Sequence, residues 1–226
     1  MIAAIAPQRA RLTAAQKRLW PRLEPSLALG FVLYGGTAIS LRLGHRRSVD
    51  FDFFHDRALE KDALRSRFGF MAQARTLQDS RITLVVSVGG LGRDPVKLSF
   101  SGGLGFGRVG DPAMTQDGVV QVASLDDLMA HKLKVILQRP EKKDYQDIAA
   151  MIRAGCDLAQ GLAAARLLFG AACQPAASLK ALVYFADGDL PRLPRAERTT
   201  LIAAASSVGP LPVLTLRSRS LAIPIA

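Results

Sequence analysis

The chain has 226 residues, of which 49% are hydrophobic and 22% are charged, the composition of an ordinary globular protein large enough for one or two domains. No apolar run approaches the ~20 residues of a membrane span, and the first residues lack the charge order of a signal peptide. Cys156 and Cys173 have no neighbouring Cys/His cluster, so we expect structural thiols, a cytoplasmic protein and no membrane partner. The net charge of +11 favours a polyanionic partner, such as a nucleotide, RNA, DNA or an acidic protein; the alternative is a dispersed, solubilising basic surface.

The elements of residues 1–122 predict an α+β domain, in which a mixed sheet is flanked by helices. Glycine and proline separate short apolar runs, and the β-branched run ITLVVSV is the clearest strand signal. In chain order we expect a helix at 10–28 with an irregularity at Pro21, a strand at 31–34, a helix at 37–43 ended by Gly44, a strand at 49–54, a helix at 56–68, and strands at 70–76, 81–88, 95–100 and 119–122.

Residues 123–226 predict a helical domain with a C-terminal tail. Ser124, followed three residues later by Asp127, is typical of a helix start before LMAHKLKVILQR, and Pro140 separates this helix from KKDYQDIAAMIRAG. Further helices are expected at 158–172, 177–186 and 195–207, followed by an extended tail.

The run VDFDFF (residues 49–54) has the apolar density of a core strand but carries two ionisable groups. Because residues two apart on a strand project from the same face, Asp50 and Asp52 point together, while Val49 and two phenylalanines cover the other face. Two carboxylates on one face repel each other unless a cation lies between them, and Mg²⁺ (or Mn²⁺) accepts such oxygen ligands together with substrate phosphates. We therefore expect Asp50 and Asp52 to bind a divalent metal ion.

A glycine pair precedes this strand and leads into a helix. Backbone N–H groups at a helix N-terminus, approached without side chains, form a seat for phosphate. Hydroxyl side chains nearby are placed to donate to a phosphate, and two arginines are placed to neutralise a triphosphate. The residues expected to bind an NTP substrate are Gly35, Gly36, Thr37, Arg46, Arg47 and Ser48.

Three blocks of sequence follow one another along the chain. They are GGTAISLRLGHRRSVDFDFF (35–54), HKLKVILQRPEKKDYQDIAAMI (131–152) and SLKALVYFADGDLPRLP (178–194). The second block is a lysine helix followed by a K/R-D-x-x-D helix. In content and order these blocks resemble the nucleotidyltransferase AbiEii/AbiGii toxin family, within the DNA polymerase β-like nucleotidyltransferase superfamily, and they cover most of the chain.

The resemblance implies a nucleotidyltransferase-like fold and a metal-dependent nucleotidyltransferase that serves as the toxin of a bacterial toxin–antitoxin or phage-defence system. Some relatives add nucleotides to the acceptor end of tRNA. It therefore implies transfer from an NTP to RNA (tRNA) or to a protein hydroxyl, with a cognate antitoxin as a partner.

The resemblance also implies roles for single residues. By position, Asp50 and Asp52 are catalytic metal ligands, Lys132 and Asp147 are catalytic residues of the helical domain, and Asp144 contributes to nucleotide binding beside them. The spacing agrees, because Asp144 and Asp147 lie three apart on one helix face. The alternative for Lys132, Lys142 and Asp144 is that they belong to ordinary solvated helix faces.

One position departs from the superfamily pattern. A third acid often stands on a later strand, which here reads PVKLSFSG, and the equivalent position is Ser99, with Lys97 two residues earlier on the same face. This departure leaves two hypotheses: an enzyme that transfers a nucleotide, or a catalytically reduced nucleotide- or RNA-binding module of the same fold. The complete G-G…S-x-D-x-D pattern favours the enzyme.

Overall fold

The computed structural model describes residues 2–89 and 94–225, which form two compact units. The first unit comprises the residues up to 107, residues 111–123 and those from 218 onward; the second comprises residues 108–110 and 124–217. The first holds a mixed sheet with helices and the second holds helices, which confirms the predicted α+β class.

The C-terminal segment differs from the expectation that it follows the helical domain. From Ser218 it belongs to the first unit. The Leu221 N–H donates to Asp56 at 3.0 Å, and the backbone of Ile223 exchanges two hydrogen bonds with the Gln121 side chain, at 2.6 and 2.9 Å. These bonds attach the segment to Asp56, which follows the strand Asp50–Phe54, and to Gln121 in the sheet.

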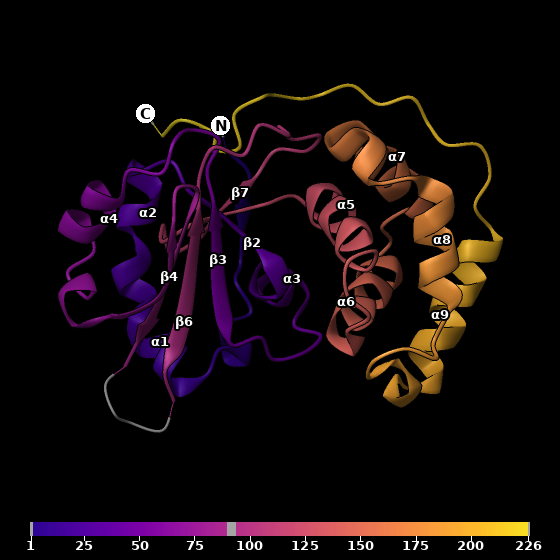
Figure 1. Cartoon of the computed structure of the whole chain (residues 1–226), viewed down its shortest axis with the longest axis horizontal. Coiled ribbons are helices and arrows are strands. Elements are labelled where there is room, and N and C mark those ends of the chain that lie inside the picture. The colour runs from indigo at the N-terminus through magenta and orange to yellow at the C-terminus, as the bar shows by residue number, and fades with distance from the viewer. Residues whose placement is uncertain (1, 90–93, 226) are drawn as a thin grey trace. The chain divides into compact units, whose positions relative to one another are not determined.

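The described residues of the first unit contain one eight-stranded sheet (Figure 1). Its order is β1-β7-β8-β2-β3-β6-β5-β4, and β3 lies antiparallel to β2 and parallel to β6. The short strands β1 and β7 were not predicted, because two or three residues show no readable alternation. The strands are β1 Ala4–Ile5, β2 Val32–Tyr34, β3 Asp50–Phe54, β4 Arg75–Ser80, β5 Thr83–Val88, β6 Val96–Ser101, β7 Ala113–Thr115 and β8 Gln121–Val122.

The core of this unit is aromatic and lies on one face of β3. Phe51 and Phe53 are fully buried. Their rings lie 6.1 Å from Trp20 and 5.3 Å from Phe100, respectively, between ring centroids. Aromatic rings bury large apolar areas, so this cluster fixes which face of β3 is turned inward.

The opposite face of β3 carries the two acids. Strand β3 alternates between half-exposed and buried residues, which confirms the predicted alternation. Val49 was expected on the core face, and this is wrong: it lies before β3 and is 55% exposed. Outside the ladder, the alternation of a strand no longer determines where a side chain points.

Helices lie on both sides of the sheet, with α3 on one side and α1, α2 and α4 on the other (Figure 1). Helix α3 ends at Gly44, which has a left-handed backbone with φ of 64°, as the sequence predicts for a helix C-terminus. The helices of this unit are α1 Ala14–Leu19, α2 Pro25–Ala28, α3 Gly35–Leu43 and α4 Lys61–Arg67.

Three predicted elements of this unit need correction. The helix expected at 10–28 is divided into α1, a 3₁₀ turn at Trp20–Leu23 and α2, because prolines begin the second and third pieces. The helix expected at 56–68 begins only at Lys61. The strand expected at 70–76 is a 3₁₀ turn, Met71–Gln73, followed by β4; Phe70 and Met71 are buried without forming a strand.

The second unit consists of five α-helices within the described residues. The Ser124 hydroxyl accepts the Asp127 N–H at 3.1 Å, which confirms the predicted N-terminal cap of α5. The helices are α5 Leu125–Val135, α6 Lys142–Arg153, α7 Leu158–Phe169, α8 Pro175–Val183 and α9 Arg195–Ser206. Across the part of the chain that the structure describes, no single helix could cross a membrane by length and apolarity; only a pair bent by 111°, residues 158–172 with 175–183, meets those criteria together.

Candidate active site

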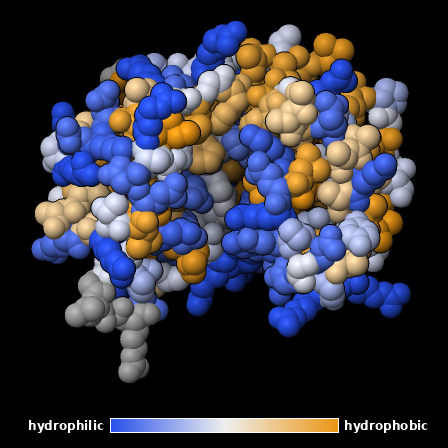
Figure 2. All heavy atoms as spheres, in the orientation of Figure 1, coloured by the Kyte–Doolittle hydropathy of each residue, from blue (hydrophilic) through white to orange (hydrophobic). Residues whose placement is uncertain are grey.

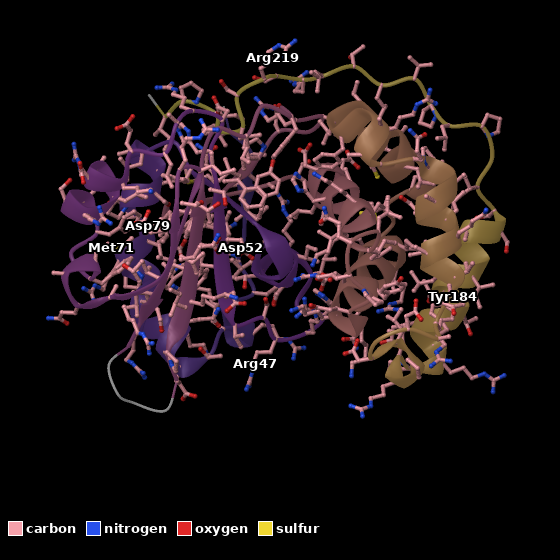
Figure 3. The ribbon with its side chains drawn as sticks, viewed as in Figure 1. Arg47, Asp52, Met71, Asp79, Tyr184 and Arg219 are labelled. Carbon is pink, nitrogen blue, oxygen red and sulfur yellow. The ribbon has the colours of Figure 1, made fainter. Side chains whose placement is uncertain are left out.

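Asp50 and Asp52 are the centre of the candidate site. Both are half-exposed and project from the same face of β3, and Asp52 lies where the strand faces α3 (Figure 3). In the neighbouring strand β6, Lys97 pairs in register with Asp50, and Ser99 pairs with Asp52. The structure therefore brings together the residues that the sequence placed on one face, and their role as metal ligands stays a prediction.

The carboxylate of Asp52 lies against the first residue of α3. Gly35 has a φ of +71°, and a Cβ atom at this position would lie 2.3 Å from Oδ2 of Asp52. Any other residue would combine a strained backbone with a steric clash, so glycine is required here. The N-terminus of α3 carries partial positive charge, which favours an anion beside it. The sequence predicted Gly35 and Gly36 as a phosphate turn but not this contact with Asp52.

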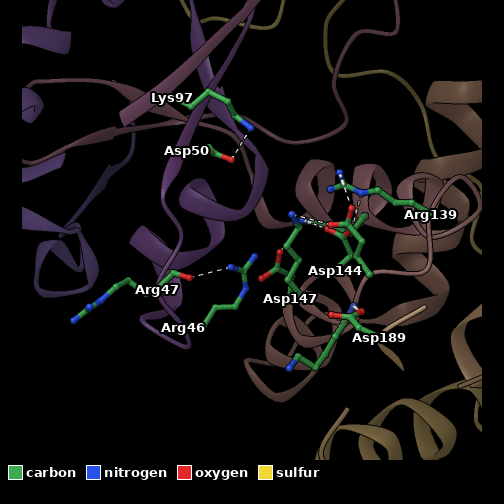
Figure 4. A network of polar contacts seen from close by, with 12 residues as sticks. Arg46, Arg47, Asp50, Lys97, Arg139, Asp144, Asp147 and Asp189 are labelled. Carbon is green, nitrogen blue, oxygen red and sulfur yellow. Dashed lines mark hydrogen bonds and ion pairs between the residues drawn. The ribbon is translucent and has the colours of Figure 1, made fainter. Parts of the chain in front are cut away.

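The other residues predicted to bind the nucleotide differ in how accessible their side chains are. Thr37 is fully buried and its hydroxyl donates to the backbone carbonyl of Asp50, so the expectation that it donates to phosphate needs correction. Arg46 is half-buried and its guanidinium donates to the Arg47 carbonyl at 3.0 Å. The exposed Arg47 side chain extends away from Asp50, as Figure 4 shows. Ser48 is half-exposed, two residues before Asp50.

Lys97 places a positive charge on the acidic face. Its Nζ lies 2.9 Å from Oδ2 of Asp50, and both side chains are partly solvated, at 45% and 32% exposure (Figure 4). Ser99, beside Asp52, contributes a hydroxyl where the superfamily pattern has an acid. Lys97 and Ser99 therefore lie on the face of the sheet that carries the two acids.

The side chains present fit one divalent ion rather than a pair of ions. Two carboxylates on one strand face, with Oδ2 of Asp52 close to the place that a Cβ at residue 35 would take, offer hard oxygen donors of the kind that Mg²⁺ and Mn²⁺ prefer. Among the described residues, no three or more His, Cys, Asp or Glu side chains are arranged to hold a metal ion. Other ligands of such an ion would have to come from water or from the phosphates of a nucleotide.

The second unit contains a separate cluster of the predicted site residues. Nζ of Lys132, on α5, lies 2.6 Å from Oδ1 of Asp144 and 2.7 Å from Oδ2 of Asp147, both on α6 (Figure 4). Nε of Arg139 contacts the second oxygen of Asp144 at 3.0 Å. The sequence did not predict this arginine contact, although Arg139 precedes Asp144 by only five residues.

Burial of this cluster overturns one alternative. The side chains of Asp144 and Asp147 are fully buried, and that of Lys132 is 8% exposed. Lys132 and Asp144 therefore do not lie on solvated helix faces. Lys132 and the two acids form an ion network between α5 and α6. Buried charges are tolerated when they are paired and hydrogen-bonded in this way.

A comparison with protein families identifies the chain. Residues 18–215 match the family model described as "Nucleotidyl transferase AbiEii toxin, Type IV TA system". The chain belongs to the AbiEii nucleotidyltransferase toxin family. This confirms the family predicted from the three sequence blocks, and with it the nucleotidyltransferase class and the toxin–antitoxin association.

One curated relative and several solved structures are similar to this AbiEii-family chain. An uncharacterized protein of Aquifex aeolicus is 31% identical over 137 residues, which are 58% of this chain and 64% of that protein. The chain thus matches slightly less than two thirds of the length of that relative.

Among solved structures, a proposed nucleotidyltransferase from H. pylori superposes with a TM-score of 0.55 at 18% identity, over 85% of this chain and 92% of that one. MenT4, a nucleotidyltransferase toxin from Mycobacterium tuberculosis, gives a TM-score of 0.57 at 14% identity, over 86% and 82% of the two chains. The antibiotic-resistance factor ANT(2'')-Ia gives 0.51 at 13% identity, over 67% and 89%. At these identities the likeness shows a shared fold, which is the predicted nucleotidyltransferase fold.

Proposed function

We propose that this AbiEii-family chain is a metal-dependent enzyme of the bacterial cytoplasm that transfers a nucleotide from an NTP to RNA. The observation that carries the proposal is the pair of half-exposed carboxylates on β3, with Asp52 packed against Gly35 at the start of α3. This arrangement puts two oxygen ligands for a cation beside a helix N-terminus that suits phosphate.

In the proposed reaction, the oxygen of an acceptor hydroxyl forms a bond to the α-phosphorus of the NTP. The bond from that phosphorus to the β-phosphate oxygen breaks, pyrophosphate leaves, and the hydroxyl proton passes to solvent. Asp50 and Asp52 hold the divalent cation, which when bound polarises the triphosphate as a Lewis acid. The N–H groups of Gly35 and Gly36 orient the phosphates, Arg46 and Arg47 offset their charge, and the Ser48 hydroxyl donates a hydrogen bond to them.

The chain's charge supports RNA as the acceptor. A net charge of +11 attracts a polyanion. Figure 2 shows hydrophilic side chains interspersed with hydrophobic ones on the face that it draws. Within RNA, the acceptor end of tRNA is the proposed target, and the toxin class implies a cognate antitoxin protein as a regulator. We also retain a catalytic role for Lys132 and Asp147, with Asp144 beside them, as the family resemblance assigns it.

The test is incubation of the full chain with each labelled NTP, Mg²⁺ and total bacterial RNA, followed by gel analysis of RNA and protein. We expect label in RNA, and we expect Asp50→Asn and Asp52→Asn to lower transfer by about a hundredfold or more, because each removes a charged ligand. Asp79→Asn is the matched control, since Asp79 is another partly exposed acid of the same unit, paired with Lys61 at a distance from α3 (Figure 3).

Two results would change the proposal. Label found only in protein would replace RNA by a protein hydroxyl as the acceptor. Unchanged transfer by Asp50→Asn or Asp52→Asn, with a normal metal requirement, would contradict the two-carboxylate site.

A second candidate function follows from Ser99 and Lys97. Since a hydroxyl replaces the third acid and a lysine neutralises Asp50, the site is also compatible with a nucleotide- or RNA-binding module of reduced activity. Binding of NTP or RNA, with no nucleotide transfer from any of the four NTPs, would favour this candidate.

A further inference from the structure

The ion pair between Lys97 and Asp50 gives the acidic face a cation of its own. Nζ of Lys97 lies 2.9 Å from Oδ2 of Asp50, the residue expected to bind the divalent ion. The parallel register of β3 and β6 sets these two residues side by side, so the contact is imposed by the sheet. Figure 4 shows the lysine reaching across to the acid.

This ion pair can open readily. Both partners are partly solvated, and exposed pairs of this kind contribute little to stability. The lysine ammonium sits on a flexible four-carbon stem and forms charge-assisted bonds with phosphate as well as with carboxylate. A divalent ion at Asp50 would repel an ammonium held on the same oxygen.

We infer that Lys97 competes with the divalent cation for Asp50, so that the ion binds well only when a triphosphate is present to accept the Lys97 ammonium. This inference rests on the proposed function and adds an order of events to it. In the protein without nucleotide, Asp50 stays paired with Lys97, and the nucleotide and the metal ion then bind together. Lys97 then acts as a residue that sets metal affinity and positions phosphate.

The test is a titration of the full chain with Mn²⁺, monitored by electron paramagnetic resonance and carried out with and without a non-hydrolysable NTP analogue. Without the analogue, Lys97→Met should bind Mn²⁺ about fivefold more tightly than the wild type, a gain within the range of an exposed ion pair. With the analogue, this advantage should disappear. Lys97→Arg, which keeps the charge, should resemble the wild type.

Lys61→Met is the matched control. Lys61 forms a comparable surface ion pair with Asp79 in the same unit, so its removal changes the net charge equally without affecting Asp50. It should leave Mn²⁺ affinity unchanged. Thermal melts confirm that each variant is folded, and Lys97→Gln repeats the measurement if Lys97→Met is unstable.

Equal Mn²⁺ affinity of the wild type and Lys97→Met in the absence of the analogue would overturn this inference alone. An equal gain in Lys61→Met would also overturn it, by showing that net charge is responsible. No Mn²⁺ binding by any of these proteins, with or without the analogue, would overturn both the inference and the metal dependence of the proposed function.

Discussion

Two regions of the chain combine a lysine with two carboxylates, and they differ in their access to water. On β3 and β6, Lys97 contacts Asp50 in a partly exposed pair with Asp52 alongside. On α5 and α6, Lys132 contacts Asp144 and Asp147, whose side chains are fully buried. The same residue types therefore appear once at a surface that ligands can reach and once inside a helical unit.

Burial decides what each group can do. Charges in contact with water can exchange partners at low cost, so the β3 face is suited to binding a metal ion and a nucleotide. Charges removed from water depend on each other, since each one left unpaired is strongly destabilising. The difference predicts that lysine removal lowers stability little in the first region and strongly in the second.

The largest expected effect is that of Lys132→Met. It leaves Asp147 without its lysine partner and Asp144 with Arg139 only, so we expect the free energy of unfolding to fall by about 3–5 kcal/mol. For a chain of this size the melting temperature should fall by on the order of 10 °C. Lys97→Met should lower stability by about 1 kcal/mol or less.

Thermal and chemical denaturation of both variants checks this contrast. Adding Asp147→Asn to Lys132→Met should restore part of the loss, because it removes a buried negative charge that has lost its lysine. Similar small losses in Lys132→Met and Lys97→Met would break the distinction between the two regions.

A smaller effect is expected from His131, which lies on α5 next to Lys132. Its ring packs edge-on against Phe169 with centroids 4.9 Å apart. Desolvation, together with the charges of Lys134 and Lys132, lowers the pKa of His131 to about 3. The folded protein thus keeps this ring neutral while the unfolded chain protonates it near pH 6.5. The contribution of neutral His131 to the free energy of unfolding is therefore fully present above pH 6.5 and is lost as the pH falls toward 3.

Denaturation of the wild type and His131→Phe at pH 7 and pH 5 measures this contribution. Between these values the wild type should lose on the order of 1–2 kcal/mol more than the variant, which keeps an aromatic ring but cannot titrate. If the free energies of unfolding of the two proteins changed equally with pH, His131 would be better hydrated than its packing indicates.

The sequence predicts the exposed region better than the buried one, because local patterns determine more of it. The alternation of β3 and the glycine that ends α3 are properties of neighbouring residues. The shared face of Lys97 and Ser99 on β6 also follows from their spacing of two residues. By contrast, the burial of Asp144 depends on how α5 and α6 pack, which spacing along one helix does not reveal.

Contacts between distant parts of the chain account for other differences. Helix α4 begins later than predicted, and Asp56, within the predicted helix, instead accepts the N–H of Leu221, 165 residues away. Gly35 is needed partly because of the Asp52 carboxylate, a contact that only the pairing of β2 with β3 creates. A single sequence does not show which of its distant residues lie beside each other in the fold.

The smallest expected effect on stability is that of Ser99→Asp, which adds a third acid to the exposed region. Without metal, the new carboxylate lies beside Asp52 and repels it, so stability should fall by about 0.5–1 kcal/mol. Mn²⁺ should bind more tightly, because a third carboxylate supplies another oxygen ligand. Ser101→Asp is the control, since Ser101 points to the same side of β6 but pairs with Phe54. If calorimetry gave both variants the same Mn²⁺ affinity, the added acid would be acting through net charge, and Ser99 would not occupy a ligand position.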